Sequence, residues 1–160
     1  MLFRSRIARE GDPTAVEFPR AMLHDGLDFS FSGLKTAVLY AVHGQNARHS
    51  DRVLTEQETA DLAASFQQAV LDVLVAKCRL AVQRFGTSTL CVGGGVAANG
   101  ALRSALEALA REQNLTLVVP PLSWCTDNAA MAAVAVDRFR AGRFDSLDLD
   151  AVAGLVRFGK

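Results

Sequence analysis

The sequence lacks the features that would identify several large classes of protein. Only three of its 160 residues are cysteine, and Cys78, Cys91 and Cys125 stand far apart with no C-x-x-C pair. This spacing excludes a zinc knuckle recognisable from sequence, and an odd number of cysteines gives no complete disulfide framework. We therefore expect a protein of a reducing compartment, and the predicted location is the cytoplasm.

An excess of charge of one sign is also absent. The 17 Lys and Arg residues balance the 17 Asp and Glu residues, so the formal net charge is zero. A strongly basic nucleic-acid module is therefore not expected, because phosphate binding usually requires a clear excess of Lys and Arg. Local basic patches are compatible with this balance.

Long apolar runs are missing as well. Arg4, Arg6 and Arg9 follow the first residues, so no signal peptide is predicted. The longest uncharged stretch, between Arg84 and Arg103, contains five glycines and is typical of a strand, a turn and a helix rather than a membrane span. Half of the residues are nonetheless hydrophobic, which is enough for the core of one soluble domain and excludes a disordered chain.

Hydrophobic periodicity and capping residues predict alternating strands and helices. The expected elements are a strand over 27–31, a helix over 34–42, a long helix from a capping box at Thr55 to about Phe85, a strand over 89–92, a helix over 98–113, a strand over 115–119 and a helix from about 126 to 140. Residues 1–26 are expected to form a short helix and an extended loop. This order predicts a helix-rich α/β fold with parallel strands.

Gly93, Gly94 and Gly95 are the strongest local signal for a ligand site. They follow a predicted strand and precede a helix, where exposed backbone amides can bind a phosphate or the sugar and base of a nucleotide. The alternative is a tight turn with close packing, and the pattern alone does not decide between the two. A dinucleotide site is rejected, because no carboxylate follows the next strand, which ends at Pro120 and Pro121.

Two other segments carry weaker signals. Asp127, at the start of the last predicted helix, is either its N-cap or a carboxylate metal ligand, and spacing alone favours the cap. Ser32, Gly33 and Lys35, at a predicted strand-to-helix turn, can contact an anion, although Lys35 is otherwise an ordinary surface charge. The three histidines form no H-x-x-x-H pair and are expected at the surface.

Four motifs in a fixed order resemble the C-terminal half of one known family. They are Phe18-Pro19-Arg20, LDFSFSGLKT at 27–36, GGVAAN at 94–99 and CTDNAAM at 125–131. Together they are similar to the tRNA N6-adenosine threonylcarbamoyltransferase family, formerly described as O-sialoglycoprotein endopeptidase-like proteins. The resemblance covers nearly the whole chain, to about Leu149.

The resemblance implies a fold, a reaction and partners. The fold is actin-like (ribonuclease H-like), with two lobes, as in Hsp70 and sugar kinases. Residues 27–149 would be the C-terminal lobe, 1–26 an extended segment from the inter-lobe region and 150–160 a tail. The family transfers the threonylcarbamoyl group from threonylcarbamoyl-adenylate to N6 of the adenosine beside the tRNA anticodon. It works with a paralogous dimerisation subunit and a P-loop ATPase subunit, and no membrane is involved.

The same resemblance implies substrate-binding roles for individual residues. Asn99 matches the family's substrate-binding asparagine, which follows the glycines. Gly94 and Gly95 are expected to bind the nucleotide part of the substrate beside it. The weaker candidates are Ser32, Gly33 and Lys35. No catalytic residue is assigned.

A metal site is also implied, usually holding one iron or zinc ion per subunit, which would orient or polarise the adenylate. Asp127 matches the aspartate that completes this site. The other ligands, an H-x-x-x-H pair, belong to an N-terminal half that this chain lacks, so a truncated product or an isolated lobe, inactive by itself, is expected. Gly100 stands where the family commonly has an Arg, so a positive charge near the site is expected to be lost.

Two alternatives remain open. A non-catalytic paralogue of the same superfamily, acting in nucleotide binding or dimerisation, would account for the missing histidine pair. A piece of an actin-like sugar kinase or chaperone fits the glycine turn but leaves the CTDN motif unexplained. The DNA upstream of Met1 would separate the transferase, with an open frame encoding H-x-x-x-H, from the paralogue, with a ribosome-binding site directly before Met1.

Overall fold

The computed structural model divides the chain into a larger compact unit, Met1–Thr126, and a smaller one, Asp127–Lys160. Residues 6–44, 53–126 and 128–146 are described. The predicted metal ligand Asp127 and the predicted tail over 150–160 lie outside these ranges.

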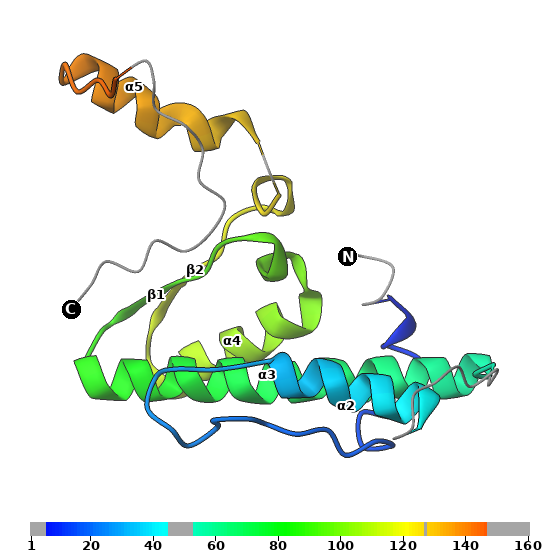
Figure 1. The fold of residues 1–160 in the computed structure, drawn as a ribbon. Coiled ribbons are helices and arrows are strands. Elements are labelled where there is room, and N and C mark those ends of the chain that lie inside the picture. Colours follow the sequence, from blue (N-terminus) through cyan, green and yellow to red (C-terminus); the bar gives the residue numbers. More distant parts are fainter. Residues whose placement is uncertain (1–5, 45–52, 127, 147–160) are drawn as a thin grey trace. The chain divides into compact units, whose positions relative to one another are not determined.

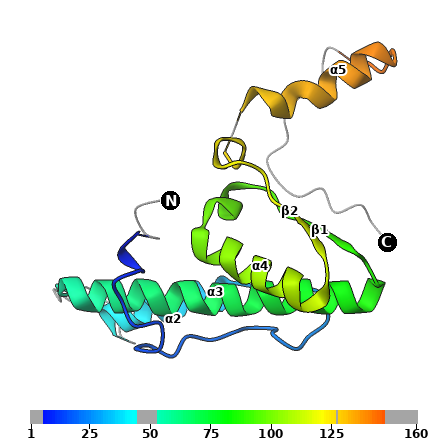
Figure 2. The same cartoon turned by 180° about the vertical axis from the view of Figure 1, so that it is seen from behind.

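Helix α3 (Glu56–Phe85) is the element around which the larger unit is built, and it runs the length of that unit in Figures 1 and 2. The predicted capping box is present: the Thr55 hydroxyl accepts from the Glu58 amide at 3.1 Å, and the Thr55 amide donates to the Glu58 carboxylate at 2.8 Å. Gly86, at φ 62°, ends the helix in the left-handed conformation that glycine adopts without strain. The predicted long helix is confirmed at both ends.

A parallel β-α-β unit follows α3. It consists of strand β1 (Thr89–Cys91), the 3-10 turn η1 (Gly95–Ala98), helix α4 (Gly100–Gln113) and strand β2 (Thr116–Val118). The two strands pair in parallel with Leu90 opposite Leu117. The predicted parallel pairing is confirmed, although each strand is shorter than expected and α4 begins two residues later.

Two apolar clusters hold helices against α3. In the first, Leu71 of α3 packs against Leu102, Leu106 and Leu109 of α4, so the sequence pattern identified the buried face of α4 correctly. In the second, the buried residues are Ala69 of α3, Leu34 of α2 (Ser32–His43) and Phe18. The phenylalanine of the Phe18-Pro19-Arg20 motif is therefore a core residue, 3 % exposed.

The strand predicted over residues 27–31 is wrong. In the described part of the chain this segment pairs with no strand, and α2 begins at Ser32, two residues earlier than expected. The rings of Phe29 and Phe31 contact each other, with centroids 5.7 Å apart, and Phe29 is 53 % exposed. The apolar alternation failed because it describes side chains, whereas a strand also requires a neighbouring backbone to bond.

An extended segment, residues 11–26, lies along α3 and runs parallel to it. At its start, Gly11 is so close to α3 that a Cβ would overlap the carbonyl of Ala60. Further along, the buried Ser65 hydroxyl donates to the Asp12 carbonyl and accepts from the Val16 amide, both at 3.1 Å. Successive residues of the segment contact successive turns of α3. Because the segment has little secondary structure, polar side chains of α3 supply hydrogen-bond partners for its backbone.

Lys77 of α3 binds the far end of this segment. Its side chain is in the core, 5 % exposed, and its ammonium donates to the carbonyls of Met22, Asp25 (3.1 Å) and Gly26 (2.8 Å). Met22 and Gly26 both have positive φ, 58° and 50°, which turns these carbonyls towards one point. All three donors of the ammonium are therefore used.

The smaller unit contains the 3-10 turn η3 (Ala129–Ala132) and helix α5 (Ala133–Arg140). The side-chain oxygen of Asn128 accepts from the Ala130 amide at 3.0 Å and caps η3. The predicted single helix from about 126 is thus a 3-10 turn followed by a shorter α-helix. Within the described ranges, no helix combines the length and apolar character needed to cross a membrane.

We predict that Lys77→Met lowers the free energy of unfolding by about 2 kcal/mol, because three carbonyls lose a charged donor while the helix propensity is unchanged. Urea unfolding followed by circular dichroism measures this. The matched control, Lys35→Met on the exposed surface of α2, should change the unfolding free energy by less than about 0.5 kcal/mol. Equal effects of the two substitutions would contradict the role given to Lys77.

Candidate functional site

Two loops meet at the carboxyl ends of β1 and β2. The glycine loop, defined as residues 93–99, follows β1, and the proline loop, residues 120–125, follows β2 and contains the 3-10 turn η2 (Leu122–Trp124). Because the strands are parallel, both loops leave the sheet at the same edge, where ligands of α/β proteins usually bind. A Cβ built on Gly95 would lie 3.8 Å from the Cys125 carbonyl, so the two loops are in contact.

The glycine loop contains one glycine that the backbone requires and two that it does not. Gly94 has φ 84°, which strongly favours glycine, and its carbonyl accepts from the Ala97 amide at 3.0 Å. A Cβ on Gly93 would meet nothing within 4 Å, and one on Gly95 would make only an ordinary contact. The described chain therefore offers no steric reason for glycine at 93 and 95.

Asn99 links this loop to α3 and α4. Its side-chain oxygen accepts from the Leu102 amide at 3.0 Å and caps α4, and its side-chain nitrogen donates to the Gln67 side chain at 2.8 Å. The residue is half-buried. The structure thus places Asn99 in the same loop as Gly94 and Gly95 and shows that it caps α4.

Arg103 is a residue that the sequence analysis missed. Its Nε donates to the Ala97 carbonyl at 2.6 Å, and its Nη2 donates to the Pro120 carbonyl at 2.7 Å and lies 3.2 Å from Cys125 Sγ. One guanidinium therefore joins both loops. The available signal was its position one helical turn after the N-cap Asn99, on the same side of α4.

The weaker candidates lie in the first turn of α2. The hydroxyls of Ser32 and Ser30 are 3.0 Å apart, and the Lys35 amide donates to the Phe31 carbonyl at 3.1 Å. Gly33 has open space around it, and Lys35 is exposed. Apart from the backbone bonds of α2 itself, the hydrogen bonds found for these residues stay within 30–36, so among the described residues none connects this turn to the glycine loop.

Within the described ranges, no three His, Cys, Asp or Glu side chains come together to hold a metal ion. The described residues therefore do not form a metal site by themselves. A positive charge does remain beside Gly100, where one was expected to be lost: the Arg9 guanidinium would lie 3.8 Å from a Cβ at this position.

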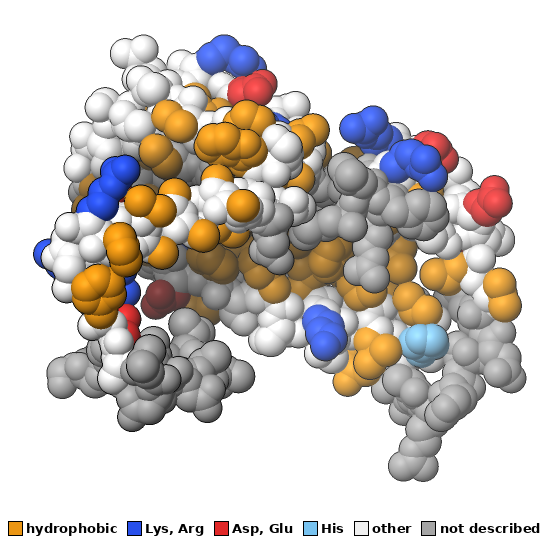
Figure 3. Space-filling view, turned by 90° about the horizontal axis from the view of Figure 1, so that it is seen from above, with side chains coloured by type: hydrophobic (Ala, Val, Ile, Leu, Met, Phe, Trp, Pro, Cys, Tyr) orange, Lys and Arg blue, Asp and Glu red, His pale blue; other side chains and the backbone are white. Residues whose placement is uncertain are grey.

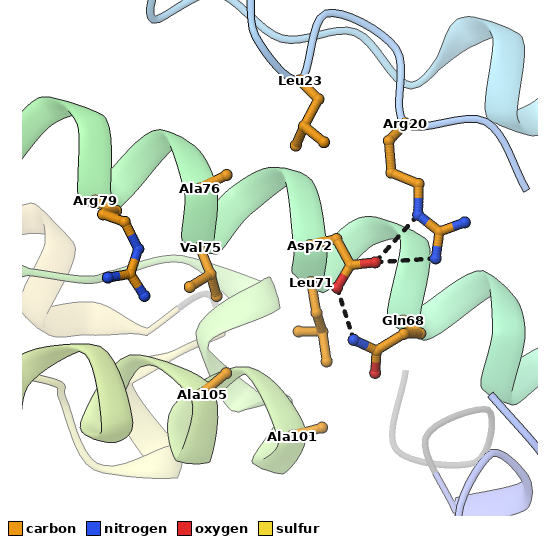
Figure 4. Close-up of a pocket in the computed structure, with 10 residues that line it drawn as sticks. All are labelled: Arg20, Leu23, Gln68, Leu71, Asp72, Val75, Ala76, Arg79, Ala101 and Ala105. Atoms are coloured by element: carbon orange, nitrogen blue, oxygen red, sulfur yellow. Dashed lines mark hydrogen bonds and ion pairs between the residues drawn. The ribbon is translucent and has the colours of Figure 1, made fainter. Parts of the chain in front are cut away.

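An open groove of about 590 Å³ lies elsewhere, between α3, α4 and the extended segment (Figure 4). The Asp72 carboxylate accepts from Arg20 at 2.9 and 3.1 Å and from Gln68 at 2.7 Å. The floor of the groove is apolar, and none of the predicted site residues lines the groove. Arg20, the last residue of the Phe18-Pro19-Arg20 motif, thus holds the extended segment on α3, and its Nη1 also donates to the Phe18 carbonyl at 2.6 Å.

The charges on the face drawn in Figure 3 are scattered rather than gathered into one basic patch. Arg79 and Glu112 pair across α3 and α4, which lowers the pKa of the Glu112 carboxyl through the hydrogen bonds from the guanidinium. The lack of one basic patch on this face agrees with the zero net charge of the chain.

The strand, glycine loop, helix and second parallel strand form one β-α-β unit, and in α/β proteins ligands usually bind at the strand ends of such a unit. Residues 2–134 match the family model of tRNA N6-adenosine threonylcarbamoyltransferase, and the chain belongs to this family. The resemblance that the four motifs indicated is confirmed. The family is one of transferases that act on tRNA.

Individual relatives give the same result. The chain is 46 % identical over 164 residues to the tRNA N6-adenosine threonylcarbamoyltransferase of Rhodopirellula baltica, a match covering 96 % of this chain and 46 % of the relative. It is 51 % identical over 150 residues to that of Trichlorobacter lovleyi (92 % and 42 %) and 47 % identical over 153 residues to that of Bacillus cereus (94 % and 43 %). The chain thus spans somewhat less than half the length of these relatives.

The three cysteines should differ in reactivity. Cys91 is exposed, Cys125 is buried, and burial raises the pKa of the half-buried Cys78 thiol. We predict that iodoacetamide modifies Cys91 first, Cys78 more slowly and Cys125 last, since only an accessible thiolate reacts. Mass spectrometry of peptides after timed quenching measures the order, and a higher pH should accelerate Cys78. Modification of Cys125 as fast as Cys91 would contradict the closed arrangement of the two loops.

Proposed function

We propose that this chain is part of an enzyme that transfers the threonylcarbamoyl group from threonylcarbamoyl-adenylate to N6 of the adenosine next to the tRNA anticodon. The observation that carries this proposal is the family match over residues 2–134. In the reaction, N6 attacks the carbamoyl carbon and loses a proton. The bond from that carbon to the phosphate oxygen breaks, and AMP leaves.

The two loops at the strand ends are the proposed site for the adenylate. Among the described residues no neighbour requires glycine at 93 or 95, which supports this site because glycine also lets a ligand approach the backbone closely. Asn99 stands at the start of α4, where backbone amides favour an anion. Ser32, Gly33 and Lys35 remain secondary candidates for the same ligand or for tRNA.

We further propose that the larger unit belongs to the C-terminal lobe of an actin-like fold. The parallel β1–β2 pair supports this, because parallel sheets are normally covered on both faces, whereas Cys91 and Val118 on one face of this pair are exposed. In this proposal a second lobe covers the exposed face and completes the site. The lobe boundaries 27–149 stay a prediction, and the larger unit also contains residues 11–26, which lie along α3.

The metal and the partner subunits are proposed from the motif match alone. Asp127 would supply one ligand to an iron or zinc ion, and an H-x-x-x-H pair outside this chain would supply the others. The proposed partners are tRNA, the paralogous dimerisation subunit and the P-loop ATPase subunit, and the proposed location is the cytoplasm.

We predict that the 160-residue chain alone does not transfer the threonylcarbamoyl group, and that transfer appears when the first half of a longer relative is added. The reason is that the proposed substrate site lies between two lobes. The measurement is incorporation of labelled threonine from threonylcarbamoyl-adenylate into unmodified tRNA. Robust transfer by the chain alone would refute the two-lobe argument, and no transfer in the mixture, with both halves folded, would favour the non-catalytic paralogue.

A series at Asn99 separates ligand binding from capping. Asn99→Ala removes both functions and should cost about 1 kcal/mol of stability, whereas Asn99→Ser keeps a capping oxygen and should cost only a few tenths. If the amide binds substrate, both variants lose transfer activity in the mixture of halves.

The control for stability is Asn114→Ala at the other end of α4. Asn114 has φ 52°, so alanine there should cost about 1 kcal/mol through backbone strain while activity is kept. Full activity of Asn99→Ser would show that Asn99 is only a cap.

A further inference from the structure

The Arg103 side chain contacts both loops of the proposed site. Its three contacts are with the Ala97 carbonyl in η1, the Pro120 carbonyl after β2 and the sulfur of Cys125. Ala97 and Cys125 are each only 1 % exposed, so the contacts with these two residues are shielded from water, whereas Arg103 itself and Pro120 are half-buried. Shielded hydrogen bonds from a charged donor are stronger than exposed ones between neutral groups.

The geometry of these contacts requires arginine. A guanidinium presents its N–H groups in a rigid planar fork, so Nε can serve one loop while Nη2 serves the other. A lysine ammonium is a compact charge on a flexible stem and cannot hold two loops in a fixed relation through a rigid plane. The base of Arg103 is itself fixed, because its amide donates to the Asn99 carbonyl at 3.1 Å in the first turn of α4.

We propose that Arg103 is a positioning residue that sets the placement of the glycine loop relative to the proline loop. This inference rests on the proposed function, which assigns both loops to the adenylate. A ligand held by both loops is bound tightly only when the loops already have the right relative position, because binding otherwise includes the free-energy cost of ordering them. In the described part of the chain, the partners of the guanidinium are two carbonyls and a sulfur, none of which is a carboxylate. Its positive charge therefore also favours an anionic ligand at the loops.

The test compares Arg103→Lys and Arg103→Met with the control Arg111→Met, an exposed position in the last turn of the same helix. The first readout, without ligand, is the set of backbone amide resonances of Gly94, Gly95 and Ala97, together with the rate of Cys125 alkylation. The second readout is the affinity for AMP, measured by titration of the same resonances. Melting curves identify any variant that fails to fold.

The expected result is that Arg103→Lys remains folded, shifts the glycine-loop resonances and accelerates Cys125 alkylation. It should also weaken AMP binding about tenfold, the equivalent of roughly 1.4 kcal/mol. Arg103→Met should have a larger effect of the same kind, and Arg111→Met none. If Arg103→Met does not fold, the resonances and the AMP affinity of Arg103→Lys test the proposal.

Unchanged glycine-loop resonances in Arg103→Lys would overturn the proposal. Unchanged AMP affinity together with faster Cys125 alkylation would also overturn it, because Arg103 would then support the proline loop alone. If the wild-type chain does not bind AMP, the proposed nucleotide site fails. The glycine-loop resonances then still decide whether Arg103 sets the relation between the loops.

Discussion

The structure depends on polar side chains of α3 that bind the backbone of residues 11–26. This segment has little secondary structure, so its amides and carbonyls need other partners. Ser65 and Lys77 supply them from two positions along the helix, and Lys77 alone takes three carbonyls. Because the segment is fixed in this way, Phe18 enters the cluster that also holds Leu34 of α2.

The other side of α3 positions the proposed site. Leu71 packs against the apolar face of α4, which brings the start of that helix to Gln67 and allows its hydrogen bond with Asn99. From the same helix, Arg103 reaches both loops at the ends of β1 and β2. Both loops are thus held by α4, and α4 is held by α3. The geometry of the loops therefore depends on the packing of these two helices.

The local parts of this arrangement could be predicted from the sequence. The capping box at Thr55, the left-handed Gly86 and the buried face of α4 each depend on residues within one or two helical turns, where spacing determines contact. The strand expected over 27–31 failed because its pairing would have required a distant backbone. The motifs identified the family for a different reason, since their residue types and order are specific even where their geometry is unknown.

The sequence by itself determined the long helix α3 with both its caps, the parallel β-α-β order and the family. Only the tertiary structure decided which polar groups meet: Lys77 with the carbonyls of the 22–26 turn, Asn99 with Gln67, and Arg103 with both loops. These partners are between 6 and 55 residues apart in the chain. Their pairing is set by how apolar faces pack, because a buried polar group bonds whichever partner that packing brings within reach.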